Sequence, residues 1–256
     1  MIFWRVLDNQ LYNVGEVNRL GFEESEGLRI PDEYLDKLQF MVMRGAQGLG
    51  DWGIISAMPR LLKQKYPTCK VYIPSPFFLG NLFNQPNEST WQNPYENVYN
   101  VFKNNPYIDG FKDFMLGEVF HDHYRNKKDI PLIKQMLKFW QFNDDEIKDY
   151  YPDLYFTKEE KEFGDEIIKE FLGDKEFAGL LITNRFESQG GRYDEKTNRK
   201  LMNILLDKFS DLPFVYWTYK KPKEIDISFE KGFDLRNVPT RIQLYIRTKA
   251  KINIGT

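Results

Sequence analysis

One carboxylate stands out among the side chains of this sequence that could do chemistry. Asp51 directly follows a glycine-rich stretch, Gly45-Ala46-Gln47-Gly48-Leu49-Gly50, and precedes a helical pattern that ends near Pro67. Because aligned peptide dipoles stabilise a negative charge in the first turn of a helix, we expect Asp51 to be ionised and able to accept a proton. A purely structural role is the alternative, since Asp is a favoured helix N-cap and glycines make tight turns for many reasons.

Two other ligand classes fit the glycine spacing less well. The dinucleotide fingerprint Gly-x-Gly-x-x-Gly requires an acidic residue after the second strand, but this chain has the order Gly-x-x-Gly-x-Gly and its next strand ends in Pro74-Ser75-Pro76. A phosphate-binding loop requires Lys and then Ser or Thr after its last glycine, where this chain has Asp51-Trp52. A carboxylate at that position would repel phosphate, so the spacing favours a role for Asp51 itself.

The histidines give no case for a metal site. His121 and His123 are the only two in the chain, and they flank Asp122. A structural or catalytic metal needs three or four convergent ligands, and the neighbouring sequence does not supply them. We expect neither a metal ion nor an organic cofactor.

The elements around Asp51 form one βαβ pattern. Apolar stretches at 38–44 and 69–74 predict two parallel strands, and the segment between them predicts a helix over about 51–66. This order places Asp51 at the ligand-facing edge of an α/β sheet. Pro59 lies inside the helical pattern and should kink it, because proline lacks a backbone donor. The expected buried stripe of this helix comprises Ile54, Ile55, Met58, Leu61 and Leu62.

We predict an α/β fold in which one α/β set is followed by a second. Residues 1–37 are an N-terminal extension with a strand at 2–7, residues 38–160 form the first domain, and residues 175–256 form the second. A helix at 158–171 is expected at the junction between the domains. The second domain is expected to contain strands at 178–183, 213–219 and 251–255 and helices at 194–209 and 240–249, the last of them capped by Thr240. Its last strand ends one residue before the sequence does, so we expect this domain to be either truncated or unusually short.

The composition of the chain indicates which classes of binding partner and which cell compartment to expect. Lys and Arg total 36 against 38 Asp and Glu, a net charge of −2, which gives no electrostatic case for a nucleic-acid partner. Cys69 is the only cysteine, so no intrachain disulfide can form. The first residues lack the pattern of a signal peptide, and no stretch reaches the roughly 20 apolar residues of a membrane span. We expect a cytoplasmic protein, and the sequence permits peripheral contact with the inner face of a membrane.

A longer stretch resembles a known enzyme family. Arg44 to Asp51, followed by Met58-Pro59-Arg60-Leu61-Leu62-Lys63 and Tyr66-Pro67, is similar to the opening of the heptosyltransferase-like glycosyltransferases, family 9. In that family a strand leads to a Gly-Asp turn, and the helix after it carries a proline near its middle. Weaker similarities follow in the same order at 105–109, 151–154, 180–192 and 234–256.

The resemblance implies a GT-B fold, in which two Rossmann-like domains face each other across a cleft. It implies inverting, metal-independent transfer of a sugar from a nucleotide diphosphate-sugar to a hydroxyl of a glycan or glycolipid acceptor, as in cell-surface polysaccharide biosynthesis. Asp51 would be the general base, and Gly48, Gly50 and Trp52 would bind substrate. The donor would contact Thr183, Arg185, Arg192, Lys196, Gly255 and Thr256. The alternative is a non-catalytic nucleotide- or sugar-binding α/β protein.

Overall fold

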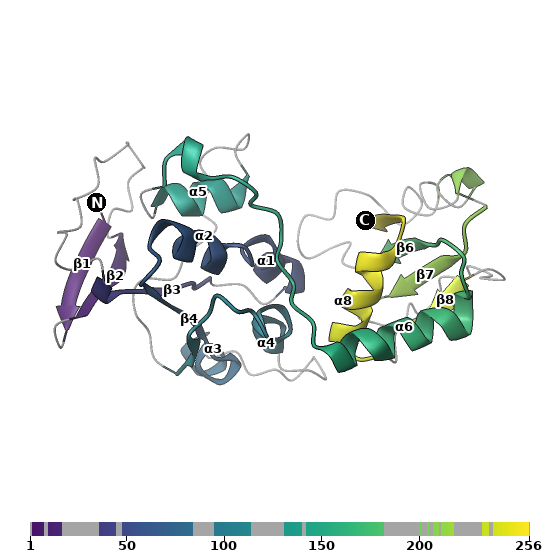
Figure 1. Cartoon of the computed structure of the whole chain (residues 1–256), viewed down its shortest axis with the longest axis horizontal. Helices are drawn as coiled ribbons and strands as arrows, with labels where there is room; N and C mark the ends of the chain where they lie inside the picture. Colours follow the sequence, from purple (N-terminus) through teal and green to yellow (C-terminus); the bar gives the residue numbers. More distant parts are fainter. Residues whose placement is uncertain are drawn as a thin grey trace. The chain divides into compact units, whose positions relative to one another are not determined.

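The chain is a mixed α/β protein that divides into two compact units, Met1–Tyr155 and Phe156–Thr256. A computed structural model describes residues 2–7, 10–16, 36–44, 48–83, 95–113, 131–139, 142–181, 200, 204, 207–209, 211–217, 232–235 and 238–255. Each unit has its own sheet, made mainly of parallel strands (Figure 1). The α/β class predicted from the sequence is confirmed.

A five-stranded sheet in the order β1-β2-β3-β4-β5 forms the centre of the first unit. Its strands are β1 Ile2–Leu7, β2 Gln10–Glu16, β3 Leu38–Met41, β4 Lys70–Pro74 and β5 Gly110–Lys112. β1 pairs antiparallel with β2, and every other neighbouring pair is parallel. The strand expected at 2–7 is present. The sequence did not predict β2, which pairs with β3 and so joins the N-terminal residues to this sheet.

Helices cover this sheet and bury its apolar side chains. They are α1 Leu49–Ile54, α2 Met58–Lys65, α3 Pro76–Phe83, α4 Glu96–Phe102, α5 Leu132–Phe139 and a short 3₁₀ helix, Asp144–Glu146. α4 packs on α1, α3 and β4, and α2 also packs on β4. The largest fully buried apolar side chains of this unit are Trp52, Tyr95, Phe40, Phe102, Leu38, Ile55, Met58, Leu61, Leu62, Ile73 and Leu79.

The prediction of a single kinked helix after Asp51 was wrong. α1 ends at Ile54 and α2 begins at Met58, with a turn between them. Pro59 is the second residue of α2, where a backbone N–H has no helical partner in any case, so proline starts this helix and does not kink it. Ile54 was expected to be buried but is 40% exposed, whereas the other four residues of the stripe are buried.

The second unit has a fully parallel sheet in the order β8-β7-β6-β9. Its strands are β6 Ala178–Leu181, β7 Phe214–Trp217, β8 Gly232–Asp234 and β9 Ile252–Gly255, and two of its helices are α6 Lys158–Leu172 and α8 Thr240–Lys249. The chain runs outward from β6 through β7 to β8 and then returns through α8 to β9 on the other side of β6. This reversal of direction creates a topological switch point between β6 and β9.

Close packing of α6 on α8 shapes this unit. A Cβ atom built on Gly164 of α6 would overlap the ring of Tyr245 in α8, so the two helices approach closely only because residue 164 has no side chain. Thr157 and Glu160 form a reciprocal capping box at the start of α6. Thr240, expected to cap α8, is instead its first residue, and Pro239 occupies the N-cap position without a side-chain cap.

Candidate functional site

Asp51 lies in the first turn of α1, the helix that follows β3 in the sequence. The N-cap is Gly48, in an extended conformation with φ −69° and ψ 139°, and it makes no side-chain cap. The backbone N–H groups of Asp51 and Trp52 both donate to the Gly48 carbonyl, at 3.1 and 3.3 Å. Asp51 is therefore not the N-cap of α1, contrary to the structural alternative considered from the sequence.

Arg44 holds the Asp51 carboxylate from the protein interior. Its Nη2 lies 2.9 Å from Oδ1 of Asp51, and its Nη1 donates to the Asp51 backbone carbonyl at 2.7 Å. The Arg44 side chain is only 1% exposed, whereas that of Asp51 is 38% exposed. One end of this ion pair is thus fixed in the core, while the carboxylate remains accessible to solvent. Arg44 belongs to the motif that resembles the glycosyltransferases, but it was not among the predicted site residues.

The three predicted substrate-binding residues have different environments. A Cβ atom on Gly48 would lie 2.5 Å from Oδ2 of Asp51, so this glycine makes room for the carboxylate. Gly50 is exposed, and a Cβ atom there would meet nothing within 4 Å. Trp52 has no exposed surface, and its ring packs edge-on against Phe102 with 6.1 Å between centroids. Trp52 is therefore a core residue and offers no face to a substrate, which corrects that expectation.

On the donor side, Gly255 is the one predicted residue whose backbone is described. It ends β9 and pairs with Leu181, the last residue of β6. The carboxyl ends of these two strands therefore meet at the topological switch of the second sheet, which is where open α/β sheets bind ligands. The other five predicted donor residues lie outside the described residues: Thr183, Arg185, Arg192, Lys196 and Thr256.

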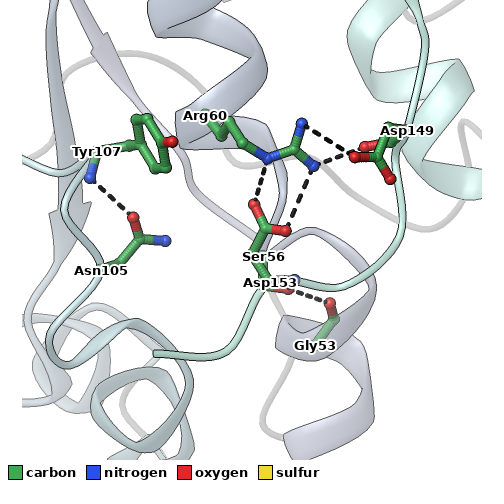
Figure 2. A network of polar contacts seen from close by, with 7 residues as sticks. All are labelled: Gly53, Ser56, Arg60, Asn105, Tyr107, Asp149 and Asp153. Carbon is green, nitrogen blue, oxygen red and sulfur yellow. Dashed lines mark hydrogen bonds and ion pairs between the residues drawn. The ribbon is translucent and has the colours of Figure 1, made fainter. Parts of the chain in front are cut away.

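A polar network supports the turn that follows Asp51 (Figure 2). Arg60 of α2 donates from Nε to Asp153 Oδ2 at 2.7 Å and from Nη2 to the Asp149 carbonyl at 2.6 Å. The Asp153 backbone N–H donates to Ser56 Oγ at 2.8 Å, and that hydroxyl donates to the Gly53 carbonyl of α1 at 2.7 Å. The segment from 149 to 153 is thereby tied to both helices of the Asp51 region.

This network also perturbs its own titratable groups. The hydrogen bond from Arg60 to Asp153 raises the pKa of the guanidinium. Burial, followed by the charge of Asp153, raises the pKa of Tyr155 to about 12. Both groups keep their protons throughout the physiological range, so they give the region a fixed charge pattern and are unsuited to proton transfer.

The described residues contain no group of three or more His, Cys, Asp and Glu side chains that could hold a metal ion. His121 and His123 lie outside them. Within the same part of the chain, no helix has both the length and the apolar character required to cross a bilayer.

Comparison with known proteins gives no relative for this chain. No protein-family model matches it, and neither the curated proteins nor the solved structures contain a match. The resemblance to family 9 therefore stays a prediction from the motif around Asp51.

Proposed function

We propose that the chain is an inverting, GT-B-type glycosyltransferase with Asp51 as its general base. The observation that carries the proposal is the placement of this carboxylate. It follows the carboxyl end of a parallel strand, it is 38% exposed, and it is oriented by a buried arginine. Such a group can accept a proton from an alcohol that approaches from solvent, and base catalysis of this kind contributes about 10²- to 10⁴-fold.

In the proposed reaction, an acceptor hydroxyl loses its proton to Asp51 while its oxygen attacks the anomeric carbon of the donor. The new carbon–oxygen bond forms as the bond from that carbon to the diphosphate breaks, and the nucleotide diphosphate leaves with the electron pair. The developing negative charge needs cations or backbone amides, for which Arg185, Arg192 and Lys196 are the candidates. The acceptor is a glycan or glycolipid hydroxyl.

We place donor binding at the switch point of the second sheet. Support comes from the strand order β8-β7-β6-β9 and from the pairing of Leu181 with Gly255, which brings two carboxyl ends together. In sheets of this topology the crevice at the switch point is the usual nucleotide site. Thr183 and Thr256 follow these two strands in the sequence and complete the proposed donor set.

Two measurements on the full chain test the proposal. A thermal-shift screen with UDP, GDP, ADP and their hexose derivatives should reveal at least one nucleotide that raises the melting temperature in proportion to occupancy. Turnover of that donor should fall by about 10²- to 10⁴-fold in Asp51→Asn, while the nucleotide-induced shift persists. Equal turnover in wild type and Asp51→Asn would remove the catalytic role.

A non-catalytic nucleotide- or sugar-binding protein is the second candidate. The observation in its favour is the Arg44–Asp51 ion pair, which would also stabilise the fold around α1 without any reaction. A nucleotide-dependent rise in melting temperature, without turnover that depends on Asp51, would support this function over the transferase.

A further inference from the structure

We infer that Arg44 and Gly48 are positioning residues, which together fix the orientation of the Asp51 carboxylate from two sides. The inference rests on the proposed function for its catalytic meaning. Its geometric part stands on the contacts alone and can be tested separately.

Arg44 fixes the first oxygen of the carboxylate. Its guanidinium contacts both Oδ1 and the backbone carbonyl of Asp51, so it restrains the side chain and the helix turn that carries it at once. Since the Arg44 side chain is 1% exposed, packing fixes its own conformation. A charged donor held in this way is stronger and more directional than a neutral one.

Gly48 fixes the position of the second oxygen. A Cβ atom at position 48 would lie only 2.5 Å from Oδ2 of Asp51, which is too close for any residue other than glycine. The backbone of Gly48 is extended with φ −69°, so the conformation itself does not require glycine. The requirement comes from the carboxylate. An alanine at 48 would force the Asp51 side chain to rotate and to weaken its contact with Arg44.

A double-mutant cycle measures this coupling without any ligand. In urea unfolding of the full chain, Gly48→Ala should lower the folding equilibrium constant of the first unit about tenfold. The loss should vanish when Asp51 is replaced by Ala, because the overlapping oxygen is then gone. Gly53→Ala is the matched control, since it lies in the same helix and its Cβ atom would meet nothing within 4 Å. It should show no coupling to Asp51.

A spectroscopic readout separates positioning from simple stability. The ¹³C carboxyl resonance of Asp51, assigned by its loss in Asp51→Asn, should shift in Gly48→Ala and in Arg44→Lys but not in Gly53→Ala. An unchanged resonance in both variants, or an equal cost of Gly48→Ala with and without Asp51, would overturn the inference. If Gly48→Ala does not fold, a double-mutant cycle of Arg44→Lys with Asp51→Ala measures the coupling of Arg44 to the carboxylate. Additive effects of these two substitutions would overturn the inference.

The same variants separate this inference from the proposed function. With UDP-glucose, GDP-mannose and ADP-glucose as donor probes, Gly48→Ala and Arg44→Lys should lower kcat at least tenfold while the donor KM changes less than twofold. Coupling and a shifted resonance without Asp51-dependent turnover would support the geometry and count against the transferase. Turnover that depends on Asp51, without coupling between positions 48 and 51, would support the transferase and count against the positioning roles.

Discussion

The two partners of the Arg44–Asp51 ion pair have very different environments. Arg44 is buried and Asp51 is partly exposed, so loss of the carboxylate would leave a charge inside the protein with one contact fewer. Breaking a buried pair by removing one partner costs more than the pair itself contributes. Asp51→Asn is therefore the better variant for kinetics, because its amide oxygen can still accept from Arg44, whereas Asp51→Ala suits the thermodynamic cycle.

Asp109 is a carboxylate held by three hydrogen bonds. Its carboxylate accepts hydrogen bonds from Lys63 Nζ at 2.7 Å, Lys70 Nζ at 2.9 Å and the Val71 backbone N–H at 2.8 Å. Burial of this carboxyl opposes ionisation, but the three hydrogen bonds outweigh burial and lower its pKa below the ordinary 3.8. Asp109 thereby connects α2 to the start of β4.

This lowered pKa predicts a pH-dependent stability. A carboxyl whose pKa is lower in the folded than in the unfolded chain stabilises the fold above its ordinary pKa, and the stabilisation is lost as the pH falls through the folded value. Asp109→Asn should therefore reduce the free energy of unfolding by about 1–3 kcal/mol at pH 7. The difference from wild type should shrink below about pH 4.

Urea unfolding of both proteins between pH 7 and pH 3 measures this difference. Asp145→Asn serves as the control, because Asp145 is an exposed residue of the short 3₁₀ helix. A deficit in Asp109→Asn that stays constant down to the lowest pH would contradict the assignment.

Among the helices, the sequence predicted best those whose ends carry local signals. α6 was expected over 158–171 and is found at Lys158–Leu172, because Thr157 and Glu160 form a capping box and Gly173 follows the last turn. α8 was expected from Thr240 to about 249 and is found at Thr240–Lys249. The extents of both helices agree with the pattern, but the start signal of α8 does not, because Thr240 is its first residue and provides no side-chain cap.

The features around Asp51 were harder to predict for a physical reason. A proline inside a helical pattern can kink one helix or start another. Here the packing of Ile55 and Met58 into the core favours two separate helices. The contact between Arg44 and Asp51 joins residues that are seven apart in the sequence, and no periodicity indicates such a pair. The sequence therefore located the candidate base but not the residue that orients it.

The Arg60–Asp153 contact makes a prediction about the segment from 149 to 155. Both side chains are mostly buried, at 11% and 17% exposed, so loss of the contact should release this segment from α2. We expect Arg60→Ala to speed chymotrypsin cleavage at Tyr150 and Tyr155 about tenfold or more.

Cleavage sites and rates can be followed by mass spectrometry of the intact chain under native conditions. Lys158→Ala is a matched control, since it removes an ion pair to Glu162 whose partners are 82% and 59% exposed, and such pairs contribute little. Equal protection of the segment in wild type and Arg60→Ala would show that other contacts hold it.

For the whole molecule, the existence of two separate cores has an energetic consequence. The core of the first unit includes Trp52 and Leu62, and that of the second includes Val215, Ile242 and Ile246. Proteins with several cores commonly depart from two-state unfolding, because each core can open by its own equilibrium. A single melting temperature would then conceal two transitions.

Gly164→Ala tests this expectation in the full chain. The added methyl group overlaps Tyr245, and overpacking of this kind costs about 1–3 kcal/mol. Hydrogen exchange should show a loss of protection of about tenfold in α6 and α8, with α2 and β4 unchanged. Leu62→Ala, which empties part of the first core, should give the reverse pattern. Loss of protection in both units with either variant would mean that they open together.

The strand order of the second sheet also constrains how the chain can fold as it is synthesised. β6 lies between β7 and β9, and β9 comes more than 70 residues later in the sequence. While the ribosome is still adding those residues, the side of β6 that will receive β9 has no partner from this sheet. Exposed strand edges of this kind recruit other chains. Slower translation after β7 would therefore lengthen the period in which the nascent protein can aggregate.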